Sequence, residues 1–509
     1  MNHWIILPLL LPLAAGILNL LLVKSGPGPQ RLVSLVAVAG LLPVAMLLLH
    51  LADSGTTSVY QLGNWPSPFG IALVVDRLSA LLLLLTAVMS WPVLLYATGG
   101  DDRRGHNFHV LFPLQVFGIN GAFLAGDLFN LFVFFEILLI ASYSLAVHGG
   151  GPERIRAGLH YVVLNLLGSS LFLVAIGTLY AVTGTLSMAD LAVKIATAAP
   201  EQATLLRISA LLLLVVFALK AAILPLHLWL PALYSSITAP VAALFAIMTK
   251  VGVYAILRTF TLIFPLNVDA VASDVAGWLP PLALLTLVAG TLGVLGSRRL
   301  TSLVAYLVVV SVGTLLAGIG LFTVAGITAT LYYLPHTTLI TAGMFLLADL
   351  IARQRGAVAD WFSPGPPMAP RVLPLLGVLF FVGAVASAGM PPLSGFIGKL
   401  LLLQAVPPEE GIWLLIWLWT IVLLGGLAAL IALSRAGSLL FWTTEGDMIA
   451  TERQRLHPRL IAPVILLLAM SVVMTILAAP ICRYAEATAG QLLTPGNYID
   501  AVLPKEKKP

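Results

Sequence analysis

Five ionisable side chains lie inside long apolar segments of this sequence, and they are the residues best suited to chemistry. They are Glu136, Lys220, Lys250, His336 and Lys399. A charge at the centre of a bilayer costs about 3 kcal/mol on insertion scales, so residues of this kind usually mark a functional path. Carboxylate, ammonium and imidazole groups can all take up and release protons. The series therefore predicts a proton relay within the membrane.

Each of these residues also has a purely structural interpretation, which the sequence leaves open. Glu136 could be protonated and hydrogen-bonded in a helix interface, and Lys220 could extend toward the membrane surface. Lys250 is harder to explain in that way, because it lies about 18 Å along its apolar segment. His336 could be a hydrogen-bonded structural histidine, whereas Lys399 follows a proline-rich interruption and could form an exit gate.

The composition places the chain among integral membrane proteins. Of its 509 residues, 60% are hydrophobic and only 9% are charged, and the mean hydropathy is +1.04, whereas soluble domains carry about 25% charged residues. The net charge of +5 does not indicate nucleic-acid binding, because the basic residues fall in short loops. The single cysteine, Cys482, excludes an internal disulfide and a cysteine metal site.

We expect no cofactor and no metal, because the sequence contains no haem-type histidine pair and no glycine-rich nucleotide loop. The chain is therefore predicted to move ions and not to be an enzyme. Small polar residues in the same spans could hold water between the charges or could simply pack helices together. These are Asn165, Ser169, Ser170, Ser235, Ser236, Thr238, Ser311, Thr337, Thr338 and Thr341.

Apolar segments recur along the whole chain and predict an all-α, polytopic membrane protein with about 14 transmembrane helices. The expected spans are 4–23, 31–52, 75–97, 108–125, 128–147, 158–182, 207–224, 238–257, 275–297, 300–320, 325–350, 371–404, 411–434 and 460–482. We expect four regions: a three-helix segment at 1–107, a first five-helix repeat at 108–257, a second at 275–434, and a C-terminal helix and tail at 435–509.

Two of the expected spans are broken by prolines that should open the helix. Pro225, Pro231 and Pro240 follow Lys220 of the seventh span in a stretch that stays mostly apolar, and Pro391, Pro392 and Gly395 lie inside the twelfth. Paired broken helices at corresponding places in two halves of a chain point to a transport path. Their separation by five helices predicts two repeats of opposite topology, comprising spans 4–8 and 9–13.

The distribution of basic residues predicts the orientation. Lys and Arg are more frequent in the odd-numbered loops, for example at Arg103, Arg104, Arg298 and Arg299. Loops rich in Lys and Arg stay in the cytoplasm. Both termini are therefore expected outside the cytoplasm.

Three long segments resemble a known family. They are GDLFNLFVFFEILLIASYSL, LKAAILPLHLWLPALYSSITAPVAALFAIMTKVGVYAILR and AGMPPLSGFIGKL. They are similar to hallmark segments of the antiporter-like subunits that respiratory complex I shares with Mrp-type multisubunit cation/proton antiporters. Within this superfamily, GDLFNLFVFFEI and a lysine at position 399 are most similar to the D-subunit group of the Mrp (Mnh or Pha) systems.

The resemblance implies specific roles for the buried residues. It implies a Glu136–Lys220 pair in a proton half-channel, Lys250 as the central relay, His336 as a connector and Lys399 as the terminal lysine. Where many members carry a lysine after this histidine, the sequence has Thr341, which shifts more of the relay onto His336 and water.

The resemblance also implies a setting and partners. These are exchange of Na⁺ or K⁺ for protons, a bacterial inner membrane and a complex with subunits A, B, C, E, F and G. The alternative function is that of a proton-pumping membrane subunit in a complex I-like or hydrogenase-linked complex.

Overall fold

The computed structural model describes residues 3–264, 269–406, 412–445 and 457–503. The helices are α1 (Leu7–Leu21), α2 (Pro27–Asp53), α3 (Arg77–Ala97), α4 (Phe108–Leu124), α5 (Leu128–Ala146), α6 (Pro152–Thr183), α7 (Met188–Ala196), α8 (Ala203–Ala221), α9 (Trp229–Tyr234), α10 (Ala239–Phe245), α11 (Met248–Arg258), α12 (Asp269–Gly296), α13 (Leu300–Gly320), α14 (Val324–Arg355), α15 (Leu373–Ala388), α16 (Ser394–Gln404), α17 (Ile412–Phe441), α18 (Pro458–Ile476), α19 (Ala478–Leu493) and α20 (Gly496–Val502).

Shorter elements connect these helices. The 3-10 turns are η1 (His3–Ile6), η2 (Val23–Ser25), η3 (Leu62–Asn64), η4 (Asp101–Arg103), η5 (Pro200–Gln202) and η7 (Gly356–Val358), and η6 (Thr259–Ile263) is π-helical. A small hairpin pairs β1 (Ser58–Gln61) antiparallel with β2 (Ala72–Val75). The predicted all-α class is confirmed, apart from this hairpin, which the sequence analysis did not anticipate.

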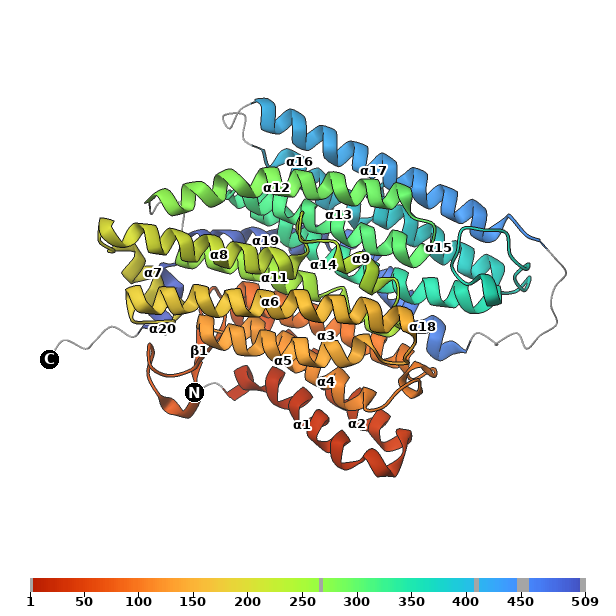
Figure 1. Cartoon of the computed structure of the whole chain (residues 1–509), viewed down its shortest axis with the longest axis horizontal. Helices are drawn as coiled ribbons and strands as arrows, with labels where there is room; N and C mark the ends of the chain where they lie inside the picture. Colours follow the sequence, from red (N-terminus) through yellow and green to blue (C-terminus); the bar gives the residue numbers. More distant parts are fainter. Residues whose placement is uncertain (1–2, 265–268, 407–411, 446–456, 504–509) are drawn as a thin grey trace.

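The helices run side by side along the long axis of the molecule (Figure 1). Among the described residues, 12 helical segments are long and apolar enough to cross a membrane. Helices α4, α15 and α16 are shorter, so the expected 14 spans require α4 to count as one span and α15 with α16 as another. That number stays a prediction. The expected last span at 460–482 is wrong at its end, because α18 ends at Ile476 and α19 begins at Ala478.

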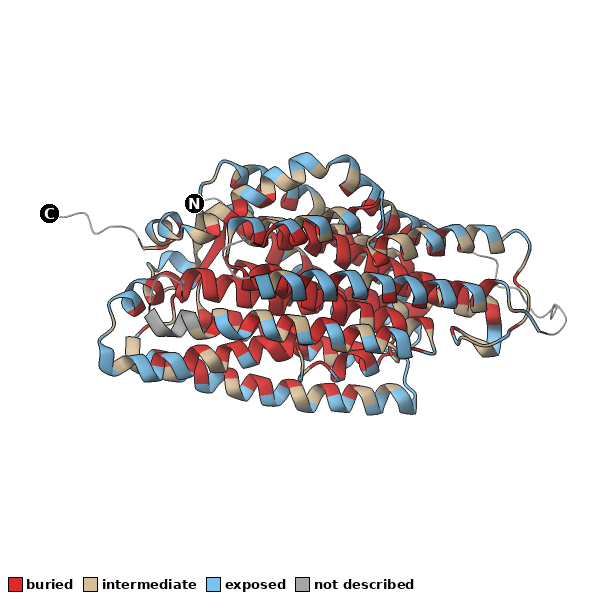
Figure 2. Cartoon of the chain, turned by 90° about the horizontal axis from the view of Figure 1, so that it is seen from above, coloured by how far each residue is buried: buried red, intermediate tan, exposed pale blue. Residues whose placement is uncertain are grey.

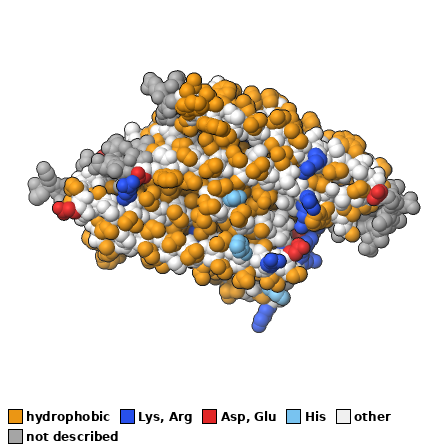
Figure 3. All heavy atoms as spheres, turned by 45° about the horizontal axis from the view of Figure 1, so that its top comes forward, with side chains coloured by type: hydrophobic (Ala, Val, Ile, Leu, Met, Phe, Trp, Pro, Cys, Tyr) orange, Lys and Arg blue, Asp and Glu red, His pale blue; other side chains and the backbone are white. Residues whose placement is uncertain are grey.

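The most covered helices form the centre of the bundle. The segments Ala239–Ile263, Leu300–Gly320 and Val324–Val358 are 100%, 94% and 89% buried over their most apolar windows, against 28% for Ile412–Phe441. Figure 2 shows the outer helices with exposed faces outward and buried faces inward. Apolar side chains cover most of the face in Figure 3. A surface that faces the hydrocarbon core of a bilayer has to be apolar, because no water is present there to hydrogen-bond polar groups.

Two helix pairs repeat the same close packing. A Cβ atom added to Gly118 of α4 would lie 2.7 Å from the Cβ of Leu138 in α5, and one added to Gly290 of α12 would lie 2.8 Å from the backbone nitrogen of Val310 in α13. The two glycines and their two partners are separated by the same number of residues along the chain. Glycine at such points lets helix backbones approach closely. The pairs α4–α5 and α12–α13 therefore pack closely in the same way, and the two five-helix repeats stay a prediction.

Both expected interruptions are present. Helix α8 ends at Ala221, the next residue is left-handed at φ +63°, and α9 begins only at Trp229. Helix α15 ends at Ala388, Gly389 is left-handed at φ +76°, and α16 begins at Ser394. A glycine suits the second position because it adopts this conformation without steric cost. The openings at the seventh and twelfth spans are thus confirmed.

Candidate functional site

Glu136 lies midway along α5 and is partly buried. Its Oε1 atom accepts a hydrogen bond from the hydroxyl of Ser169 on α6. Helix α5 is fixed at its start by Asp127, whose carboxylate accepts a hydrogen bond from the backbone N–H of Asn130 at 2.6 Å. This cap fixes the start of α5, the helix that carries Glu136.

Lys220 occupies the last turn of α8, where the helix opens, and only 8% of the residue is exposed. Its Nζ atom donates a hydrogen bond to Oδ1 of Asn165 at 3.1 Å and lies 6.0 Å from the centre of the Phe135 ring. The side chain therefore does not extend to the membrane surface. Among the described residues, no ion pair within 4.0 Å joins Lys220 to Glu136. In place of the expected direct pair, each group has its own neutral partner on α6.

Lys250 lies in α11 and is completely buried. Its Nζ atom donates a hydrogen bond to Oγ of Ser311 on α13 at 3.3 Å, and that hydroxyl donates onward to the carbonyl of Val308 at 2.7 Å. Gly252 lies close to the lysine on α11, and a Cβ added there would be 2.5 Å from the backbone nitrogen of Ala221. The missing side chain lets α11 touch the end of α8, which brings the helices of two buried lysines into contact.

His336 lies on α14 and is 2% exposed. Its Nδ1 atom and Oγ of Ser394, the first residue of α16, are hydrogen-bonded at 2.7 Å. Oγ of Ser394 is in turn 2.8 Å from Oγ of Ser471 on α18. On the other side of the ring, a Cβ added to Gly395 would lie 2.7 Å from Nε2. The opened twelfth span therefore packs directly against the imidazole.

Lys399 reaches back across the same opening. Its Nζ atom donates a hydrogen bond to the carbonyl of Ala388, the last residue of α15, at 2.7 Å. Carbonyl groups at the end of a helix carry partial negative charge and have no partner within the helix. The ammonium therefore caps α15. Gly389 leaves it room, because a Cβ at that position would lie 2.9 Å from Nζ.

Four of the five predicted residues lie on helices of the core that contact one another. They are Lys220 on α8, Lys250 on α11, His336 on α14 and Lys399 on α16. Helix α8 touches α11, α11 touches α13, and α14 packs against both α13 and α16. Thr341 is buried on α14 and cannot carry a charge. The middle of the row thus contains hydroxyl groups and one imidazole in place of a further ammonium.

Sequence reasoning found some of the polar partners and missed others. Of the ten small polar residues expected near the path, Asn165, Ser169 and Ser311 contact its charged groups. Ser394 lies within the segment AGMPPLSGFIGKL, which was already identified as important, so the sequence contained a signal for this residue. Ser471 lies in an ordinary apolar helix and gave none.

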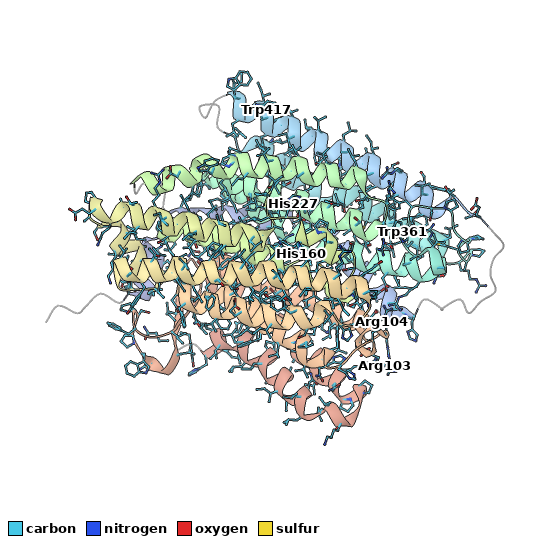
Figure 4. The ribbon with its side chains drawn as sticks, viewed as in Figure 1. Arg103, Arg104, His160, His227, Trp361 and Trp417 are labelled. Carbon is cyan, nitrogen blue, oxygen red and sulfur yellow. The ribbon has the colours of Figure 1, made fainter. Side chains whose placement is uncertain are left out.

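A second polar cluster, which the sequence analysis missed, lies at one end of the bundle. Asp102 accepts hydrogen bonds from Arg31 at 2.6 Å and contacts Nε2 of His109 at 3.0 Å. Burial opposes the charge of Asp102, but hydrogen bonds from His109 and Arg31 hold its pKa at about 2. Its neighbour Asp101 contacts Arg353 of α14 at 2.6 Å. The cluster therefore ties the loop before α4 to the end of α14. Figure 4 places the nearby Arg103 and Arg104 at this end.

The contact between Gly395 and His336 yields a prediction. In Gly395→Ala the new methyl group would meet the carbonyl of Ala386 and Nε2 of His336, so α16 must move away from the imidazole. Overpacking of this kind costs about 1–3 kcal/mol. We expect a lower unfolding temperature of the purified protein and about a tenfold loss of proton flux.

The matched control for this substitution is Gly377→Ala on α15, where no atom lies within 4 Å of the added Cβ. It should behave as the wild type in thermal unfolding and in flux. Equal behaviour of the two variants would contradict the role assigned to the close contact at Gly395.

Comparison with known proteins places these features in context. Residues 125–425 match a family model described as NADH:quinone oxidoreductase/Mrp antiporter, transmembrane. The chain is 41% identical over 539 aligned positions to the D subunit of a probable K⁺/H⁺ antiporter of Rhizobium meliloti, with 99% of this chain and 98% of the relative covered. It is 37% identical to the D subunit of the Na⁺/H⁺ antiporter of Alkalihalophilus pseudofirmus, with 99% and 100% covered.

Solved structures show the same architecture. A chain of the Mrp complex from Dietzia sp. DQ12-45-1b superposes with a TM-score of 0.83 at 25% identity, covering 99% of this chain and 100% of that one. A chain of the membrane-bound sulfane sulfur reductase, an archaeal respiratory membrane complex, gives 0.87 at 25% identity, covering 98% and 99%. Both breaks and the central buried helices thus belong to a fold that is known from membrane complexes.

Proposed function

We propose, since this chain belongs to the NADH:quinone oxidoreductase/Mrp antiporter transmembrane family, that it is the proton-conducting subunit of a multisubunit Na⁺(K⁺)/H⁺ antiporter. The observation that carries this proposal is Lys250. It is completely buried in a helix that the protein covers on all sides, and its ammonium donates to a neutral hydroxyl. A buried ammonium without a counter-charge weakens the fold, so a proton-transfer role best accounts for it.

The proposed path follows the row Glu136, Lys220, Lys250, His336 and Lys399. Proton entry loads Lys220, and the proton is then passed from Lys220 toward Lys250. Contacts of α8 with α11 and of α11 with α13 support the first half of the path. The hydrogen bond between His336 and Ser394 supports the second half. The path runs from the repeat at 108–257 into the repeat at 275–434.

The partners and the location follow from the relatives. Two relatives are named as D subunits of antiporters, and a chain of an Mrp complex shares the fold. We therefore propose assembly with subunits A, B, C, E, F and G in a bacterial inner membrane. Elements near both termini, η1 and α20, each contact β1, and Arg103 and Arg104 lie at the opposite end of the bundle (Figure 4). This arrangement supports both termini outside and basic loops inside.

The alternative function is that of a proton-pumping subunit in a complex I-like or hydrogenase-linked complex. The likeness to a chain of the sulfane sulfur reductase favours it. The subunits that co-purify with the chain separate the two functions, because redox subunits carry cofactors and antiporter subunits do not.

The test of the antiporter function is an ion-exchange assay. The complete set of neighbouring subunits is expressed with this chain, and everted vesicles are acidified inside by respiration. Addition of Na⁺ or K⁺ should dissipate the pH gradient across the vesicle membrane. A pH-sensitive dye reports this change. The more effective cation identifies the substrate. Absence of dissipation by either cation, in vesicles that contain the whole complex, would contradict antiport.

A further inference from the structure

Helix α6 provides separate partners for Glu136 and Lys220. The hydroxyl of Ser169 donates to the carboxylate of Glu136, and the ammonium of Lys220 donates to Oδ1 of Asn165. Residues four apart lie on the same face of a helix, one turn from each other. Asn165 and Ser169 are both buried. One face of α6 therefore holds both members of the proposed pair.

The orientation of the Asn165 amide is fixed by a second hydrogen bond. Its Nδ2 atom donates to the backbone carbonyl of Tyr161 at 2.9 Å, and the Tyr161 hydroxyl is 2.9 Å from that of Ser142 on α5. With the nitrogen engaged in this way, the amide oxygen is the atom presented to Lys220. The contact is therefore set by the structure of α6 and does not depend on a chance rotamer of the lysine.

On the opposite face of α6, the turns level with Asn165 and Ser169 are apolar, whereas Glu153, Arg156 and His160 are exposed nearer the start of the helix. Val163, Leu166 and Leu167 are exposed, as expected for a face directed at lipid. Ser170 is also exposed, and its hydroxyl donates to the carbonyl of Leu166 within the same helix. The hydrogen bonds to charged side chains are thus confined to the face that carries Asn165 and Ser169.

We propose that Asn165 and Ser169 are positioning residues that hold Glu136 and Lys220 apart. Helix α6 thereby sets the equilibrium between a state in which each side chain binds its own partner on α6 and a state in which the two form an ion pair. This inference rests on the proposed function. Hydrogen bonds to ionised groups are stronger than those between neutral groups, so each contact compensates in part for the lost attraction between the two charges. A cavity of about 10 Å³ beside Asn165 and Lys220 has room for roughly one water molecule.

The surroundings of Lys220 contain few other titratable groups. Helix α12 also packs against α8, but its Asp274 pairs with Arg207 near the opposite end of α8. The groups on the described helices nearer to Lys220 are Glu136 and Tyr143 of α5, Tyr161 of α6 and Lys250 of α11. Glu136 is the only carboxylate in this set. If α6 no longer separates the pair, Glu136 becomes the partner of Lys220 and keeps the ammonium protonated to higher pH.

The test compares Ser169→Ala and Asn165→Leu in vesicles that contain the assembled complex. Each substitution removes one hydrogen bond to an ionised group, and we expect proton flux to fall about tenfold. We also expect the alkaline limb of the flux-against-pH profile to move up by about one pH unit. Ser169→Thr keeps the hydroxyl and should restore flux and profile. Ser170→Ala, on the outer face, should match the wild type.

The outcomes separate this inference from the proposed function. Normal flux and an unshifted profile in Ser169→Ala and Asn165→Leu, with flux lost in Glu136→Gln, would overturn the role of α6 and leave the relay standing. Normal flux in Glu136→Gln as well would remove the relay itself. If Asn165→Leu prevents assembly, Asn165→Asp decides. It preserves volume and gives Lys220 a permanent carboxylate partner, so flux should be lost; wild-type flux would overturn the inference.

Discussion

In vesicles that carry the assembled complex, Lys250→Met is expected to lower cation-dependent proton flux by about 100-fold or more, the scale set by loss of a proton-transfer group. Lys250 is completely buried, whereas Lys220 keeps 8% of its surface exposed. In the proposed path a proton that leaves α8 passes α11, and methionine offers no site for it. The measurement is the rate at which added Na⁺ or K⁺ dissipates an imposed pH gradient.

The same substitution should not harm the fold. Methionine has a length similar to that of lysine and carries no charge, and replacing a buried charge with an apolar side chain is often neutral or stabilising. We therefore expect unchanged assembly and an equal or higher unfolding temperature. Lys194→Met is the matched control, because that lysine is exposed and pairs with Asp190 at 3.1 Å on a surface helix. A fully active Lys250→Met complex would refute the relay at its centre.

Glu136→Gln and Lys220→Ala form the second large prediction. Each should abolish cation-dependent proton flux, again by about 100-fold, while the complex still assembles. Glutamine keeps the volume of Glu136 and can accept the hydrogen bond from Ser169, but it cannot carry a negative charge. Any loss of flux in this variant is then caused by the loss of the negative charge and not by a change in packing.

The control for Glu136→Gln is Glu153→Gln, an exposed residue in the first turn of α6. It changes the same functional group on the neighbouring helix and should leave flux unaltered. The amount of complex is measured in parallel by co-purification of the other subunits. Retention of normal flux by Glu136→Gln or Lys220→Ala, with the complex intact, would exclude the pair from proton transfer.

The broken helices could be predicted from the sequence because their cause is local. Pro225 and Pro392 lack a backbone donor and clash with the preceding turn, and the structure has both openings. Two repeats were predicted from the spacing of these breaks. The matching close contacts of Gly118 and Gly290 could be recognised only in three dimensions.

Errors arose where the sequence signal was weak or short. The hairpin of β1 and β2 has strands of only four residues each, too short for a clear alternation of polar and apolar side chains. The apolar stretch near the C-terminus continues past Ile476 without a proline until Pro480, so the end of α18 could not be located. Asp101 and Asp102 were not considered in the sequence analysis, and their buried contacts to α2, α4 and α14 were missed.

The sequence by itself determined which groups in the membrane can carry charge, where two helices must open and that the chain spans the bilayer many times. These features follow from residue type and local spacing. Only the tertiary structure decided which atoms those groups touch: Asn165 and not Glu136 for Lys220, Ser311 for Lys250, and Ser394 for His336. The physical reason is that such contacts depend on how each helix is rotated and packed against helices distant in sequence, which no local pattern specifies.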